Sequence, residues 1–216
     1  MWCIRAIDGI YRKRMYDIID LYTKKNRQLL VIAIDGKPKQ IVSDKRKPMP
    51  MKPGSPERYD YEYVRKGTAS ISVAVEFKTG KRITGVTKRR TTKDFAMFVK
   101  EVPDRYPRAM KLHIVLDNIN THFAGSFGKT FGEEQAKSIL QRIGFHYTQK
   151  HAIWLNVAET EINVMDMECT NRRFEDFKSL EQEVSAWTRR RNRDKKKIKW
   201  GFDRAKAEKK SSKYYV

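Results

Sequence analysis

Three acidic residues, far apart in the chain, have the types and positions that a shared cation site requires. Asp35 and Asp117 each end an apolar run, LLVIAID and KLHIVLD. Such runs predict strands that are buried on both faces. Sheets of this kind bind their ligands at the carboxyl ends of the strands. Glu159 lies near the start of a predicted helix that follows the sequence WLN. Three carboxylates at one point repel each other unless cations neutralise them.

The ligand chemistry of these side chains predicts a reaction class. Ligation by oxygen alone selects hard ions such as Mg²⁺ or Mn²⁺. Two such ions roughly 4 Å apart can activate water or a DNA 3′-hydroxyl and stabilise the leaving oxygen of a phosphodiester. We therefore predict phosphoryl transfer with two divalent ions, Mg²⁺ or Mn²⁺, held by Asp35, Asp117 and Glu159.

Each of these acids also has a simpler structural interpretation. Asp117 could cap the turn after its strand, because Asp and Asn are ordinary turn residues. Glu159 could complete a capping box with Asn156. Glu161 competes with Glu159 for the site, since residues two apart lie about 200° from each other around a helix. Helical spacing does not decide between the two, because each flanks the apolar stripe of Ala158, Ile162 and Met165.

Composition points to a polyanionic partner. The 216 residues include 47 Lys and Arg against 26 Asp and Glu, a formal net charge of +21. Such an excess attracts polyanions, with nucleic acid the first expectation and an anionic membrane surface the second. No apolar run approaches the roughly 20 residues that span a bilayer, and the N-terminal sequence lacks the apolar core of a signal peptide. Cys3 and Cys169 are too few for a disulfide framework, so we expect a cytosolic protein with reduced thiols.

The hydrophobic pattern predicts an α/β fold. In chain order it predicts a helix within 1–27, strands at 29–35, 68–75 and 81–86, a helix at 93–102 capped by Thr92, a strand ending at Asp117, a helix at 133–142, a strand at 145–148, a helix from Val157 and a last helix from Ser179. This order predicts a mixed sheet with helices on both faces, and Asp35 and Asp117 on adjacent central strands. We expect three segments: a helical lead-in (1–28), a catalytic core (29–178) and a basic C-terminal helix and tail (179–216).

Two stretches are predicted to be loops, and basic residues cluster at several places. The connection at 37–67 is rich in Pro and Lys, and glycines punctuate residues 120–132. Loops as long as the first are functional or disordered in most compact domains. Basic clusters are ordinarily solvated, but the overall charge favours phosphate contacts. The residues predicted to bind nucleic acid are Lys37, Lys88, Arg89, Arg90, Arg190, Arg191 and Lys196.

These segments also carry a family resemblance. AIDGKPKQ, RRTTKDFA, HIVLDNINTHF, HYTQKHAIWLNVAETEI and WGFDRAKAEKKSSKYYV resemble the DDE transposases of bacterial insertion sequences, in the insertion-sequence-630 branch of the Tc/mariner superfamily. The resemblance covers nearly the whole chain. It implies a ribonuclease-H-like fold with a mixed five-stranded sheet, two catalytic divalent ions and cut-and-paste DNA transposition. It also implies that Asp35, Asp117 and Glu159 are the catalytic, metal-binding triad.

The resemblance implies partners as well. Transposon ends and target DNA are the expected ligands, with no membrane partner, and the expected location is the cytoplasm, at the nucleoid. The 37–67 connection occupies the place of a loop that reaches the partner subunit in mariner-type relatives, which makes a homodimer on DNA an expectation.

The chain departs from the family pattern in several places. Gly36 stands where the family usually has Glu, Ile153 precedes Trp154 where the family often reads SWLN, and MDMECTNRR is unusual. Full-length relatives begin with helix-turn-helix domains, and nothing before Asp35 resembles two of them, so we expect the catalytic half alone, with recognition domains on a separate chain as one arrangement. The alternatives are a catalytically impaired, truncated nucleic-acid-binding relic, and a nuclease acting on RNA or branched DNA.

Overall fold

A computed structural model describes residues 7–24, 29–117, 123–149 and 152–212. Its helices are α1 (Gly9–Thr23), α2 (Thr92–Asp104), α3 (Phe123–Phe131), α4 (Glu133–Gln141), α5 (Val157–Met165), α6 (Phe177–Arg193) and α7 (Arg204–Ser211). Its strands are β1 (Leu30–Asp44), β2 (Tyr63–Glu76), β3 (Lys81–Thr87), β4 (Leu112–Leu116) and β5 (Ile143–Tyr147). Two short elements, the 3₁₀-helix Ile153–Leu155 and the π-helix Asp166–Thr170, flank α5.

The five strands form one mixed sheet in the order β3-β2-β1-β4-β5. β1 pairs with β2 in the antiparallel direction and with β4 in the parallel direction, and β5 is parallel to β4. Ile34 of β1 lies opposite Leu116 of β4, so the two strands leave the paired part of the sheet at the same level. The prediction that Asp35 and Asp117 follow adjacent central strands is therefore confirmed.

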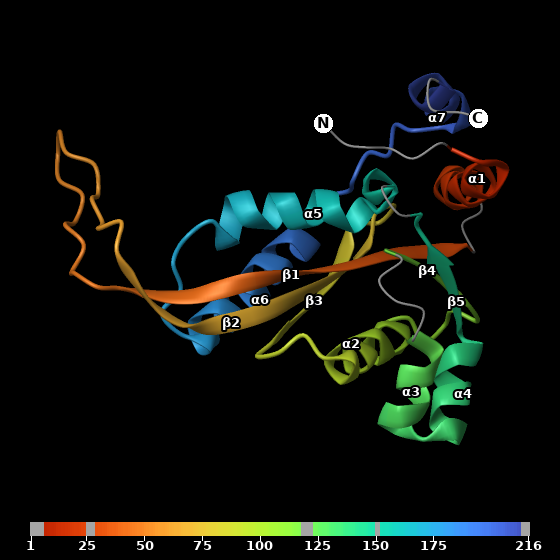
Figure 1. Ribbon diagram of the computed structural model, residues 1–216, viewed down its shortest axis with the longest axis horizontal. Helices are drawn as coiled ribbons and strands as arrows, with labels where there is room; N and C mark the ends of the chain where they lie inside the picture. Colours follow the sequence, from red (N-terminus) through yellow and green to blue (C-terminus); the bar gives the residue numbers. More distant parts are fainter. Residues whose placement is uncertain (1–6, 25–28, 118–122, 150–151, 213–216) are drawn as a thin grey trace.

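Helices cover both faces of this sheet, as predicted (Figure 1). The alternation of side chains along β1 divides the core into two sides. Val31 and Ala33 pack in a cluster with residues of α1 and α5, whereas Ile32 and Ile34 pack in a cluster with residues of α2, α3 and α4. A third cluster joins α5 and α6 to β2. The apolar runs are therefore buried on both faces, which is what their lack of alternation predicted.

The predicted loop at 37–67 is strand at both of its ends, so that prediction is wrong in part. β1 continues to Asp44 and β2 begins at Tyr63, so a long two-stranded arm projects from the sheet (Figure 1). Pro38 is tolerated because β4 pairs with β1 only as far as Ile34, which leaves β2 as the one described neighbour of β1 at that point. In the connection between β1 and β2, isolated β-bridges pair Met49 with Arg58 and Lys52 with Ser55.

The predicted loop at 120–132 is also wrong in part. Residues 123–131 form α3, and the part of the prediction at 120–122 lies outside the described residues. Phe127 is fully buried in the cluster beneath α2 and α4. Burial of this side chain outweighs the low helix propensity of Gly125 and Gly128, which costs about 1 kcal/mol each.

The predicted helix starts at Glu133 and Val157 are confirmed, whereas the caps of α2 and α6 differ from the prediction by one and three residues. Thr91, not Thr92, caps α2, and its side chain forms a capping box with Asp94. Asp176, not Ser179, caps α6 by accepting a hydrogen bond from the Ser179 amide. In α6 the residue that is capped was thus mistaken for the cap, whereas in α2 the predicted cap is the residue after the true one. The helix α7 was not predicted at all.

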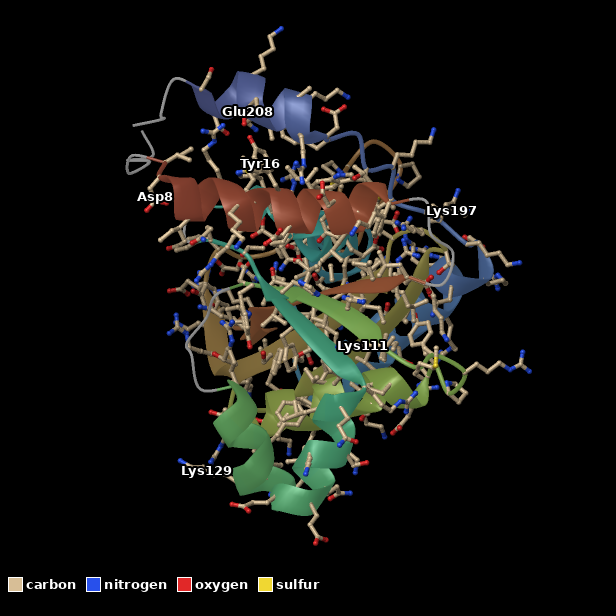
Figure 2. The ribbon with its side chains drawn as sticks, turned by 90° about the vertical axis from the view of Figure 1, so that its right-hand side faces the viewer. Asp8, Tyr16, Lys111, Lys129, Lys197 and Glu208 are labelled. Carbon is tan, nitrogen blue, oxygen red and sulfur yellow. The ribbon has the colours of Figure 1, made fainter. Side chains whose placement is uncertain are left out.

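The C-terminal helix α7 packs on α1, at the opposite end of the sequence (Figure 2). Arg204 forms a two-pronged ion pair with Asp20 and lies over the Tyr16 ring, and Arg12 pairs with Glu208. The division into segments 1–28, 29–178 and 179–216 stays a prediction. No helix in the described part of the chain has the length and apolar character needed to cross a membrane.

A histidine pair on β4 and β5 makes stability depend on pH. His113 and His146 stack, with a nitrogen of each ring 2.9 Å apart. Burial, followed by the neighbouring His113, lowers the pKa of His146 to about 4. Between about pH 4 and 6.5 the unfolded chain therefore binds a proton that the folded protein does not, so stability decreases as pH falls through this window.

We expect His146→Gln to remove part of this decrease, on the order of 1 kcal/mol after allowance for the partial exposure of the ring. Urea denaturation of both proteins at pH 7 and pH 4.5 measures the difference. An equal loss of stability in the two proteins would contradict the assignment to His146.

Candidate active site

The three predicted acids converge at the carboxyl ends of β1 and β4. Asp35 keeps the phase of Ala33 along β1, and Asp117 keeps the phase of Val115, so both face the α5 side of the sheet. Glu159 lies in the first turn of α5. One carboxylate oxygen from each residue lies within 4.8 Å of the other two, and all three side chains are partly buried.

Asn156, the N-cap of α5, fixes the helix against both strands. Its side-chain oxygen accepts a hydrogen bond from the Ala158 amide at 3.2 Å. Its side-chain nitrogen donates to the Ile34 carbonyl at 3.1 Å and lies 3.4 Å from the Asp117 carboxylate. Only 1% of Asn156 is exposed. A single buried amide therefore sets where the first turn of α5, and with it Glu159, lies relative to the strand ends.

Further hydrogen bonds orient the two aspartates. The Thr148 hydroxyl donates to Oδ1 of Asp117 at 2.9 Å, and the Gly36 amide donates to Oδ1 of Asp35 at 2.7 Å. A Cβ atom at Gly36 would lie 3.2 Å from the Ile71 carbonyl oxygen of β2. Gly36 is thus the residue that the close approach of β2 favours, and its departure from the family pattern leaves Asp35 in place.

Burial and mutual repulsion both act against three ionised carboxylates here. Burial, as the larger cause, raises the pKa of Asp35 to about 6; the negative charges of Asp117 and Glu159 add to it, while the Gly36 amide and Arg90 oppose it. Burial and then Asp117 also raise the pKa of Glu159. A site of this kind favours a bound cation, because the cation removes the repulsion.

Glu161 belongs to a different cluster from the one that contains Glu159. Glu161 is fully buried and forms an ion pair with Arg82, which is also fully buried, and a second with Arg191 at 3.3 Å. Arg82 donates further hydrogen bonds to the carbonyls of Gly80 and Lys196. Glu161 therefore points into the protein while Glu159 faces the strand ends.

The structure separates the predicted nucleic-acid contacts into two groups. Lys37 pairs with Asp166, and Arg190 with Glu168 at 2.9 Å. Arg191 is 13% exposed and pairs with Glu161 and Glu168, so its charge is neutralised inside the protein. These two ion pairs disfavour a contact between Arg191 and a phosphate.

The second group is exposed. Lys88, Arg89 and Arg90 follow β3, and the Lys88 ammonium lies over the Phe177 ring. Arg89 and Arg90 line a hollow together with Asp35 and Asp117. Lys196 is also exposed, and its carbonyl accepts from Arg82. The β3–α2 connection is therefore the predicted basic cluster that lies beside the acids.

Sequence reasoning missed the supporting roles of Thr148 and Asn156. Thr148 follows β5 as Asp117 follows β4, and its amide bonds to the Leu116 carbonyl at 2.9 Å. This equivalent position after a parallel strand was the available signal. Asn156 was predicted only as a helix cap, because its contacts with β1 and Asp117 depend on the packing of α5.

The donors fit divalent cations. Oxygen atoms of Asp35, Asp117 and Glu159 are hard ligands of the kind that Mg²⁺ and Mn²⁺ prefer. The two aspartates also have the neighbours that metal ligands typically have: the Thr148 hydroxyl and the Asn156 amide beside Asp117, and the Gly36 amide beside Asp35. The residues present therefore suit such an ion.

The family described as DDE superfamily endonuclease matches residues 31–181, which is more than half of the chain. The chain belongs to this family. No curated protein is significantly similar to this DDE endonuclease chain in sequence.

Solved structures confirm the predicted ribonuclease-H-like fold. The structure of the Mos1 mariner paired end complex with Mn matches with a TM-score of 0.52 and 13% identity, over 88% of this chain and 58% of that one. A pre-cleavage Mos1 transpososome matches with a TM-score of 0.51 and 12% identity, over 99% of this chain and 62% of that one. The chain thus spans about three fifths of the Mos1 chains that it resembles.

The opposite orientations of Glu159 and Glu161 predict opposite effects of the same substitution. Glu159→Gln removes one of three repelling charges, so stability without metal should not decrease, and the stabilisation by Mn²⁺ should be lost. Glu161→Gln leaves Arg82 buried without its full partner and should cost about 3 kcal/mol of unfolding free energy. Urea denaturation with and without Mn²⁺ measures both; a destabilised Glu159→Gln protein beside an unaffected Glu161→Gln protein would reverse the assignment.

Thr148 should act as a positioning residue for Asp117. Thr148→Val preserves volume but removes the hydroxyl, and loss of such a partner weakens metal affinity about 10–100-fold. Thr148→Ser keeps the donor and should restore most of the affinity. Calorimetric titration with Mn²⁺ compares the three proteins, and wild-type affinity in the Val variant would show that the hydroxyl has no such role.

Proposed function

We propose that this chain is the catalytic domain of a DNA transposase of the insertion-sequence-630 type, which cleaves and joins DNA strands with Mg²⁺ or Mn²⁺. The observation that carries the proposal is the convergence of Asp35, Asp117 and Glu159 within 4.8 Å at the strand ends of a DDE endonuclease domain. Membership of an endonuclease family supports phosphoryl transfer as the reaction class.

The chain's own residues would position the reaction. The carboxylates of Asp35, Asp117 and Glu159 would hold a pair of divalent ions. Bound there, such ions supply Lewis acidity that favours attack on a phosphodiester by water or a 3′-hydroxyl. Thr148 and Asn156 keep Asp117 oriented, and Arg89 and Arg90 place positive charge beside the acids, where a DNA phosphate must approach.

DNA is the proposed partner, as transposon ends and as target. The net charge of +21 supports it, as does the description of the Mos1 structures as a paired end complex and a transpososome. We further propose that the arm reaches a second copy of the chain, because Met51 and Tyr61 are 76% and 87% exposed there. End recognition would come from helix-turn-helix domains, and the location would be the cytoplasm, at the nucleoid.

Replacement of the central aspartate tests the reaction. Asp117→Asn should lower Mn²⁺-dependent nicking of plasmid DNA by more than about 100-fold, since loss of an outer partner alone costs 10–100-fold. DNA binding, which comes from Lys and Arg, should remain and should weaken steeply with salt. Nicking assays and fluorescence anisotropy measure the two quantities.

Asp104→Asn, the same change at the exposed end of α2, is the matched control and should cleave as the wild type does. Wild-type protein that binds DNA but never cleaves it with Mn²⁺ would overturn the enzymatic proposal in favour of a binding relic. Preference for an RNA–DNA hybrid over duplex DNA would instead indicate a different substrate for the same site.

A further inference from the structure

Two hollows lie side by side at the start of α2. The first, of about 300 Å³, contains Asp35 and Asp117 on one side and Arg89, Arg90 and Phe95 among its other lining residues. It therefore begins at the acids and extends over the β3–α2 connection.

The second hollow, of about 540 Å³, lies between α2 and α3. It is lined by Thr92, Lys93, Gly125, Ser126, Lys129 and Thr130. Thr92 lines both hollows, so the two adjoin each other at the start of α2. Lys129 lies on α3, in the helical layer below the sheet (Figure 2).

The cations of this path are free to bind a ligand. Arg89, Arg90, Lys93 and Lys129 are all exposed, and none forms an ion pair with another residue in the described ranges. The basic residues on α5's side of the sheet differ, because Lys37, Arg190 and Arg191 are paired with acids.

We propose that the two hollows form one track for a single DNA strand, which leads from the carboxylates past Arg89 and Arg90 to Lys93 and Lys129. Single strands are held by basic grooves that follow the backbone, with aromatic side chains available to the bases. Phe95, which packs against the core, contributes one edge of the first hollow's lining. This inference rests on the proposed function, because it assigns the strand that continues from the reacting phosphate.

Binding of DNA with a single-stranded extension tests the track. The probes are a blunt duplex and the same duplex with an extension of about eight nucleotides, in either polarity. Wild-type protein should bind the extended probe about tenfold more tightly. The double variant Lys93→Glu with Lys129→Glu should abolish that gain. It should also make the slope of log Kobs against log[salt] shallower by about 1.4, because two phosphate contacts are lost.

The matched control is Lys137→Glu with Lys209→Glu, which makes the same charge change at exposed lysines on α4 and α7. It should keep the gain. The track is refuted if the wild type shows no gain, or if the two double variants lose it equally. Mn²⁺-dependent nicking by the wild type separates the proposals: cleavage without a specific effect of Lys93 and Lys129 refutes the track alone, whereas absence of cleavage refutes the proposed function.

Discussion

The docking of α5 across the ends of β1 and β4 is the constraint on which the active-site arrangement depends. Asn156 satisfies the Ile34 carbonyl, the Ala158 amide and part of Asp117 from one buried side chain. Each buried polar group left unpaired costs about 1–3 kcal/mol, so any shift of α5 along the sheet is penalised more than once. The helix is therefore held at the position where Glu159 meets two carboxylates that repel it.

On the opposite side of α5, an ion pair between Glu161 and Arg82 also holds the helix in place. Glu161 brings a buried charge to Arg82, whose other donors reach the carbonyls of Gly80 and Lys196. A buried ion pair is weak evidence for net stability, because desolvation offsets much of the attraction. Its effect here is on geometry: the pair couples α5, β3 and the segment after α6, so the helix cannot rotate to exchange Glu159 for Glu161 without leaving charges unpaired.

Features that depend on local sequence pattern could be predicted from the sequence. Features that depend on tertiary contacts could not. Apolar runs that stop at Asp35 and Asp117 specified buried strands and their ends, because burial on both faces removes alternation. The arm was missed because Pro38 disfavours regular structure unless a strand lacks a neighbour, and only the reach of β4 decides that. α3 was missed because Phe127 stabilises a glycine-containing helix through packing. The choice of Glu159 over Glu161 required the position of Arg82, which is 79 residues away from Glu161 in the sequence.

Whether a basic residue is paired with an acid depends on where it lies in the fold. Basic residues near the buried carboxylates of α5 and the π-helix are neutralised there, as Lys37 is by Asp166 and Arg191 by Glu161. These pairs remove charge from the side of the sheet that must pack. Beside Asp35 and Asp117 the opposite holds, since Arg89 and Arg90 are exposed and neither forms an ion pair with an acid in the described residues. A polyanion that approaches the acidic site therefore meets unpaired positive charge next to carboxylates that would otherwise repel it. The two opposite charges can coexist there because cations bound by the carboxylates would remove the repulsion.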